Sequence, residues 1–239
     1  MITAIPLLHR ILILSAITLT LLTALPAAAT QIYFNNFTSG AGAEWTYTTA
    51  SGVHQTTSGN QFLGQFADQT VSLTFAGRPA AEITVSFDLF IIGNWDGNAT
   101  SPTIADKWEL KAAGGPTLLS TTFSNRNTPG QSYPDPYNPS QVVNNPKFTG
   151  GVHYSSGIST PANSDTDYTL YQLTYSFLFA GGDLVLQFSS DVTSPTQETF
   201  ALDNVIVDNS PPAAVPEPAT LLLLGSGLIG LATFRKFKK

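Results

Sequence analysis

The feature that most restricts the fold of this chain is a hydrophobic alternation with a period of two. Residues 82–92 carry an apolar side chain at every second position, and polar residues such as Ser86 and Asp88 lie between them. Successive side chains of a strand point to opposite faces of a sheet, so this segment is predicted to be a long strand with one buried face. The same alternation marks residues 71–75, 107–111, 171–179 and 184–188.

Shorter strands are predicted at residues 31–34, 45–49, 61–66, 118–123 and 201–207. Turn sequences rich in glycine and proline separate the strands, and no window outside the two termini has the pattern of an amphipathic helix. Many short strands with turns between them are typical of antiparallel sandwiches. We therefore expect an all-β domain, an antiparallel β-sandwich of jelly-roll type.

The first 29 residues have the three parts of a secretory signal peptide. His9 and Arg10 are followed by an apolar stretch at residues 11–25, and Ala27 to Ala29 supply small residues for cleavage. We expect signal peptidase to cut near Thr30. An uncleaved N-terminal anchor is the alternative, and Pro26 with the alanine run disfavours it.

Residues 30–209 have the length of one domain and a strongly acidic charge balance. They contain five lysines and arginines against fifteen aspartates and glutamates, so nucleic acid is not an expected partner. The chain has no cysteine, which excludes disulfides and thiolate metal sites. Residues 210–214, Ser-Pro-Pro-Ala-Ala, form a short, stiff linker after this domain.

An apolar segment near the C-terminus has the character of a membrane anchor. Residues 219–234 carry no charge, and as a helix they would span about 24 Å, somewhat less than the ~30 Å core of a bilayer. A mismatch of this size is tolerated. Four cations follow the segment and would stay in the cytoplasm by the positive-inside rule: Arg235, Lys236, Lys238 and Lys239. We expect a single transmembrane helix, with the large domain outside.

The sequence before this helix reads Val215-Pro216-Glu217-Pro218. A Pro-Glu-Pro triplet, an apolar helix and a short basic end, in this order, resemble the PEP-CTERM sorting signal. The resemblance covers residues 215–239 and implies recognition by exosortase, cleavage near the triplet and transfer of the domain to the envelope surface. An ordinary single-pass anchor is the alternative. The same tail occurs on proteins labelled ice-binding, so it assigns no activity to the domain.

Acidic residues gather around the turn at residues 93–98 and near the last predicted strand. Calcium prefers six to eight hard oxygen ligands, and we consider Asp88, Asp96, Asp106 and Asp203 as a calcium site, with Asn94, Asn98, Glu198 and Asn204 nearby. The spacing does not fit an EF-hand. Turn formation accounts for the asparagines, aspartates and glycines equally well, and backbone amides are an alternative partner for Asp203.

The region 124–167 shows no sustained alternation and is rich in Asn, Pro, Ser, Gly and Tyr. Aromatic faces stack on sugar rings while neighbouring polar groups bind hydroxyls. We therefore consider a ligand-binding set of Trp95, Tyr133, Tyr137 and Tyr154. The alternative is that the tyrosines only fix the long loop to the sandwich.

No catalytic motif stands out, because the two histidines of residues 30–209 lie outside metal-ligand spacings and no G-x-S-x-G elbow is present. We expect an exported, non-enzymatic module of the cell surface or extracellular matrix that binds or organises polysaccharide. One rival is a secreted glycan hydrolase, for which Asp106 with Glu109 or Asp96 with Asp106 are the carboxylate pairs to test. The other rival is an ice-binding or matrix-packing protein.

Overall fold

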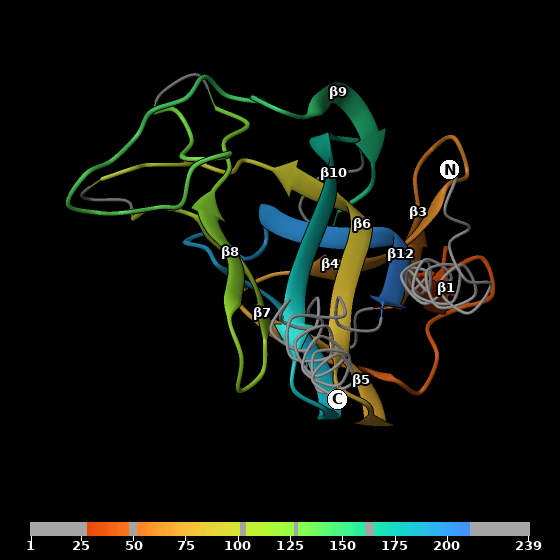
Figure 1. The fold of residues 1–239 in the computed structure, drawn as a ribbon. Coiled ribbons are helices and arrows are strands. Elements are labelled where there is room, and N and C mark those ends of the chain that lie inside the picture. Colours follow the sequence, from red (N-terminus) through yellow and green to blue (C-terminus); the bar gives the residue numbers. More distant parts are fainter. Residues whose placement is uncertain (1–27, 48–51, 101–103, 127–128, 161–164, 211–239) are drawn as a thin grey trace, which may run out of the picture. The chain divides into compact units, whose positions relative to one another are not determined.

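The computed structural model describes residues 28–47, 52–100, 104–126, 129–160 and 165–210, which lie within one compact unit except for residue 28. The regular secondary structure of these residues consists of β-strands. None of these residues forms a helix that is long and apolar enough to cross a membrane. The predicted sorting tail lies outside the described residues, as does the predicted signal peptide apart from residues 28 and 29. The strands are β1 (Thr30–Asn35), β2 (Trp45–Thr46), β3 (Gly52–Gln55), β4 (Gln61–Phe66), β5 (Thr70–Arg78), β6 (Ala81–Gly93), β7 (Lys107–Ala112), β8 (Thr117–Thr122), β9 (Val152–Ile158), β10 (Thr166–Phe179), β11 (Gly182–Asp191) and β12 (Glu198–Ser210) (Figure 1).

The strands form two antiparallel sheets that pack face to face. The larger sheet has the order β3-β4-β12-β6-β10-β9, with β1 paired to the second half of β12. The smaller sheet has the order β2-β5-β11-β7-β8. The prediction of an all-β, antiparallel sandwich of jelly-roll type is confirmed.

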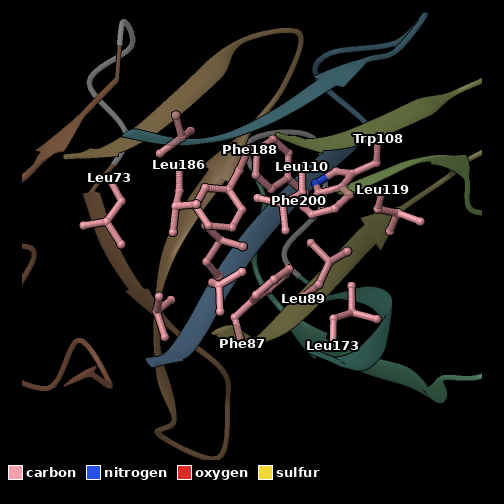
Figure 2. Close-up of a cluster of buried hydrophobic side chains, with 14 of the residues drawn as sticks. Leu73, Phe87, Leu89, Trp108, Leu110, Leu119, Leu173, Leu186, Phe188 and Phe200 are labelled. Carbon is pink, nitrogen blue, oxygen red and sulfur yellow. The ribbon is translucent and has the colours of Figure 1, made fainter. Parts of the chain in front are cut away.

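The long strand β6 lies at the centre of the larger sheet, between β10 and β12. Its alternating apolar side chains point into the sandwich and are almost fully buried: Ile83, Val85, Phe87, Leu89 and Ile91. Aromatic rings from both sheets meet there, and Figure 2 shows Phe87 and Phe200 facing Trp108 and Phe188. The ring of Trp108 lies 5.9 Å from Phe87 and 6.1 Å from Phe200 between centroids, so it joins the two sheets directly.

The outer face of the larger sheet is divided into two halves. Where β6 ends and β10 begins, a second buried cluster covers it: Phe62, Phe90, Ile92, Ile158, Tyr168 and Ala201. Towards the other end, the outward residues of β6 and β10 are polar and open, and two cross-strand hydroxyl pairs link them: Thr84 with Ser176 and Ser86 with Thr174. One half of this face is therefore packed, and the other half is available to solvent.

Two strands differ from the sequence-based prediction. The prediction missed β3 and β9, and both β9 and the first residues of β10 lie inside the region 124–167 that we expected to be irregular. Most of β9 is exposed, so it carries no hydrophobic alternation that would mark it as a strand. The predicted strand at residues 45–49 is observed only at Trp45–Thr46, and its last two residues lie outside the described part.

The segment between β8 and β9, drawn in green in Figure 1, is fixed by one isolated β-bridge between Gln131 and Asn145 and by the side-chain amides of these two residues. The Gln131 side chain donates to the Thr149 carbonyl (3.1 Å) and accepts from the Tyr171 hydroxyl (3.1 Å). The Asn145 side chain donates to the carbonyls of Ser132 (2.8 Å) and Tyr133 (3.1 Å). These bonds satisfy backbone groups that would otherwise be buried without partners.

Replacing Gly93 by alanine tests how tightly the end of β6 is held. Gly93 has φ of +82°, and a Cβ there would lie 2.0 Å from the Gln197 carbonyl oxygen. We expect Gly93→Ala to lower the free energy of unfolding of the full chain in detergent by about 2 kcal/mol or more, measured by urea titration. Gly59→Ala is the matched control, because Gly59 has φ of +92° but nothing within 4 Å of its Cβ position. Equal losses in the two variants would contradict the close contact at Gly93.

Candidate functional site

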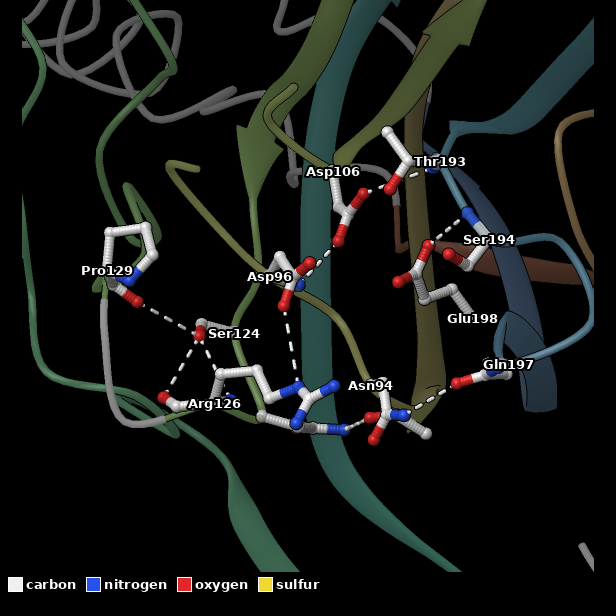
Figure 3. A network of polar contacts seen from close by, with 12 residues as sticks. Asn94, Asp96, Asp106, Ser124, Arg126, Pro129, Thr193, Ser194, Gln197 and Glu198 are labelled. Carbon is white, nitrogen blue, oxygen red and sulfur yellow. Dashed lines mark hydrogen bonds and ion pairs between the residues drawn. The ribbon is translucent and has the colours of Figure 1, made fainter. Parts of the chain in front are cut away.

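Three carboxylates from separate segments meet at one end of the sandwich. Asp96 follows β6, Asp106 precedes β7 and Glu198 begins β12. One oxygen of each lies within 4.8 Å of the others, and we call these three residues the acid cluster. Figure 3 shows them converging between the loop after β6 and the loop before β12.

Short contacts between these two loops hold the acid cluster in place. The backbone N–H of Asn94 donates to the Gln197 carbonyl (3.0 Å), and the Asn94 side-chain amide donates to the Gln197 side chain (2.9 Å). Within the loop after β6, the Asp106 backbone N–H donates to the Gly97 carbonyl (3.0 Å). The approach of the loops needs glycine at position 93, for the steric reason given above.

The electrostatics of the acid cluster are unfavourable for three ionised groups. Asp106 is fully buried, and this burial, with the negative charges of Glu198 and Asp96 adding to it, raises its pKa to about 7. Its carboxylate accepts from the backbone N–H groups of Asp96 and Thr193. Glu198 is also buried, which raises its pKa, and it accepts from the Ser194 N–H at 2.6 Å.

Among the described residues, one ion pair offsets this charge: Arg126 Nε lies 3.4 Å from Asp96 Oδ1. Three carboxylates and one guanidinium leave a local excess of negative charge. The oxygen donors match the preference of calcium, which takes carboxylates and completes its shell with carbonyls and water. The acid cluster therefore fits a divalent cation in ligand type and charge.

The four aspartates considered as calcium ligands separate into two pairs. Asp96 and Asp106 meet in the acid cluster, whereas Asp88 and Asp203 lie opposite each other on β6 and β12. Asp203 accepts from the backbone N–H of Asn204 (2.7 Å), so a backbone amide is its partner. Burial, with the charge of Asp88 adding to it, raises the pKa of Asp203 to about 6.

A groove of about 410 Å³ lies on the open half of the outer face of the larger sheet. We call it the outer groove, and its lining includes Phe34, Ser86, Asp88, Gln172, Thr174, Asn204 and Ile206. These residues come from four adjacent strands, β1, β12, β6 and β10. The alternation that buries one face of β6 places Ser86 and Asp88 on this opposite face.

A bulge in β12 shapes the outer groove. The register of β12 against β6 shifts between Asp203 and Ile206, and Asn204 adopts a left-handed conformation with φ of +49°. The Asn204 side chain then donates to Asp88 Oδ2 at 2.8 Å, while Gln172 Nε2 donates to Asp88 Oδ1 at 3.2 Å. Asp88 thus holds one amide on each side of it.

Phe34 supplies an aromatic surface beside these polar groups. It faces Ile206 across the β1–β12 pair, and half of its surface is exposed (50%). Each of the two amides that donate to Asp88 retains its carbonyl oxygen, and the Gln172 amide also retains a second N–H, whereas Asn204 Nδ2 also donates to Asp203 Oδ2 at 3.4 Å. An exposed ring next to oriented amides can stack on a sugar and bind its hydroxyls.

The four aromatic residues considered as ligand contacts do not line the outer groove. Trp95 is fully buried and donates to the Thr199 carbonyl at 3.0 Å. Tyr133 packs on Phe123 with 5.0 Å between centroids. The Tyr137 backbone N–H donates to Ser120, and the exposed Tyr154 stacks on Tyr168 at 4.7 Å. The contacts of Tyr133 and Tyr137 attach the long loop to the sandwich.

Sequence reasoning missed Phe34 and Gln172 as site residues, and it named Asn204 only beside the candidate calcium site, not as part of a groove. For Gln172 the sequence carries a signal, because this residue belongs to the polar face of an alternating strand. What the sequence does not show is which polar faces of different strands are neighbours. The bulge that turns Asn204 towards Asp88 has no glycine to mark it.

Several solved structures are similar to this chain. One is the CBM22-1 xylan-binding domain from Paenibacillus barcinonensis Xyn10C, with 12% identity, a TM-score of 0.39 and coverage of 79% of this chain and 100% of that one. Another is the K3 cleaved adhesin domain of Lys-gingipain from Porphyromonas gingivalis, with 12% identity, a TM-score of 0.38 and coverage of 74% and 98%. A search of curated proteins found no match.

A family model matches the C-terminal segment, outside the described residues. The match is to the PEP-CTERM protein-sorting motif and spans residues 214–236. It includes the Pro-Glu-Pro triplet of Pro216, Glu217 and Pro218 together with the basic residues Arg235 and Lys236. The chain therefore carries a PEP-CTERM protein-sorting motif at residues 214–236.

Proposed function

We propose that this chain is an exported, non-catalytic module of the cell surface or extracellular matrix that binds polysaccharide in the outer groove. The observation that carries the proposal is the half-exposed Phe34 beside the amides that Asp88 orients. The sorting motif supports export and delivery to the envelope. An acidic domain without cysteine is compatible with that location.

The positions of the carboxylates favour binding over hydrolysis. A glycosidase needs two carboxyl groups that flank an accessible bond. Asp106 is fully buried, and its partner Asp96 donates a backbone N–H to it. Glu109 lies on β7 in the smaller sheet, 3.5 Å from Lys111. Neither candidate pair therefore faces the outer groove.

Removing the ring of Phe34 tests the binding site. We expect Phe34→Ala to weaken retention of the full chain, in mild detergent, by roughly fivefold to thirtyfold, because one stacking contact and its buried area are lost. The measurement is electrophoresis through gels that contain a neutral glucan, galactan or mannan. Leu178→Ala is the control, since Leu178 is 76% exposed on the same strand as Gln172 but outside the groove. Unchanged retention of Phe34→Ala, or ice-growth inhibition without retention on any polymer, would overturn the proposal.

We also propose that the acid cluster binds calcium and so ties the loop after β6 to the loop before β12. Asp96, Asp106 and Glu198 would be ligands, and the ion would offset the repulsion between their charges. The ion would act on stability and loop order, since the fully buried Asp106 offers no surface for a substrate. A site of this kind suits an exported protein, which meets calcium outside the cell.

Calcium is expected to raise the melting temperature by about 5–10 °C at concentrations far above its dissociation constant. Asp106→Asn should abolish this response, whereas Asp191→Asn, at an exposed ion pair with Lys107, should retain it. Differential scanning calorimetry with EDTA or millimolar calcium measures both effects. A melting temperature that is the same with EDTA and calcium would remove the metal from the proposal.

The metal-free protein should also lose stability as the pH rises from about 4 to about 7. The pKa of Asp106 is raised from 3.8 to about 7 in the folded chain, so the folded state binds more protons than the unfolded state in this window. The stabilisation by calcium should therefore be larger at about pH 8 than at about pH 5.

For the sorting motif, we propose that exosortase recognises it and cuts near the Pro-Glu-Pro triplet. Replacing Pro216, Glu217 and Pro218 by alanine should leave residues 219–239 attached to the exported protein. Intact-mass measurement of surface material from cells that contain exosortase shows the difference. Replacing the linker prolines Pro211 and Pro212 is the control. A wild-type protein that retains the tail in most molecules would show that the segment is a permanent anchor.

A further inference from the structure

We propose that the outer groove is one half of a longer trough, which takes an internal stretch of an uncharged polysaccharide and disfavours polyanionic chains. This inference rests on the proposed polysaccharide binding and adds the direction and the charge of the ligand. It follows from a second depression beside Phe34 and from the charges that line both depressions.

The second depression lies on the other side of Phe34. It measures about 350 Å³, and its lining includes Tyr33, Asn36, Ser39 and Glu44. We call it the edge depression, because β1 pairs with β12 alone among the described strands. Phe34 lines both the edge depression and the outer groove, so the two hollows adjoin at this residue.

This arrangement sets the direction of a bound chain. The outer groove crosses β10, β6, β12 and β1, and strands lie about 4.8 Å apart, so it extends roughly 14 Å perpendicular to the strands. The edge depression continues beyond β1. A ligand that fills both hollows is an extended polymer that passes over Phe34, with one sugar stacked on the ring and others on either side.

The charged residues that line the two hollows are all acidic. Asp88 lines the outer groove and Glu44 lines the edge depression. None of the lysines and arginines in the described part of the chain lines either hollow; of these five, Lys107, Lys111 and Arg126 form ion pairs elsewhere. A polyuronate or sulfated chain would therefore bring its charges against like charges with no cation to receive them.

The two acids are already occupied by hydrogen-bond donors of the protein. Asp88 accepts from Gln172 and Asn204, and Glu44 accepts from the Tyr33 hydroxyl at 2.8 Å. Their role is to orient neutral donors and acceptors, which then face the ligand. Such a lining matches the hydroxyl groups of a neutral sugar, each of which both donates and accepts.

The charge preference is tested with pairs of polymers that differ only in charge. Neutral glucan, galactan and mannan are each compared with the same polymer oxidised at C6 to the polyuronate, in gels at low ionic strength. We expect the chain to bind the neutral polymer at least about fivefold more tightly than its oxidised form. This ratio corresponds to roughly 1 kcal/mol, which is the repulsion between two like charges 4 Å apart in water. The ratio of the two affinities should decrease at high salt, because salt screens the repulsion. Asp88→Asn should also decrease this ratio, because it removes one of the two acidic charges.

The extent of the trough is tested by blocking one half of it. Ser39→Trp places a large side chain in the edge depression and should lower the affinity for long oligosaccharides to that for short ones. Ser140→Trp, on an exposed turn outside both hollows, is the control. Melting temperatures of the variants verify that they fold.

The outcomes separate this inference from the proposed function. Retention of a polyuronate as tight as that of its neutral parent overturns the charge preference and leaves polysaccharide binding intact. Equal affinities of Ser39→Trp and the wild type for long oligosaccharides overturn the longer trough. Absence of retention on every polymer overturns both the proposed function and this inference.

Discussion

The structure depends on the two-sided character of β6. One face must be apolar to fill the space between the sheets, where Phe87 contacts Trp108 and Phe188. The other face must stay polar where nothing covers it, and there Asp88 holds the amides of Gln172 and Asn204. The strand that fixes the core therefore also fixes the outer groove, and both follow from the same alternation of side chains.

The acid cluster lies where the ends of three strands meet: β6, β7 and β12. The loop after β6 packs Trp95 into the core, and the loop before β12 does the same with Val192. The hydrogen bonds that join the two loops to each other are polar contacts of Asn94, Gln197 and Asp106. In a chain without cysteine, no disulfide can connect these loops. A bound cation would serve the purpose that a covalent link serves in other exported domains.

The sequence predicted the parts of the fold that hydrophobic alternation marks. The long strands follow from it, since each has one buried face, and β4 was predicted with the bounds that it has. β9 has no such face, and it became a strand through its pairing with β10. Asp96 and Asp106 were grouped because they lie close in sequence, whereas Glu198 joins them only through the packing of the two loops. The groove was missed for the same reason, because Phe34 and Gln172 come together only when β1, β12, β6 and β10 are placed in order.

The separation of the two faces of the larger sheet also bears on how such a domain diversifies. The side chains of Ser86, Gln172 and Thr174 lie on the open face, opposite the buried rings, so their replacement leaves the packing between the sheets unchanged. Substitutions at distant, independent sites add in their effects on stability. If the outer groove binds polysaccharide as proposed, exchange of these few residues would change the preferred polymer while the interior of the sandwich stays the same.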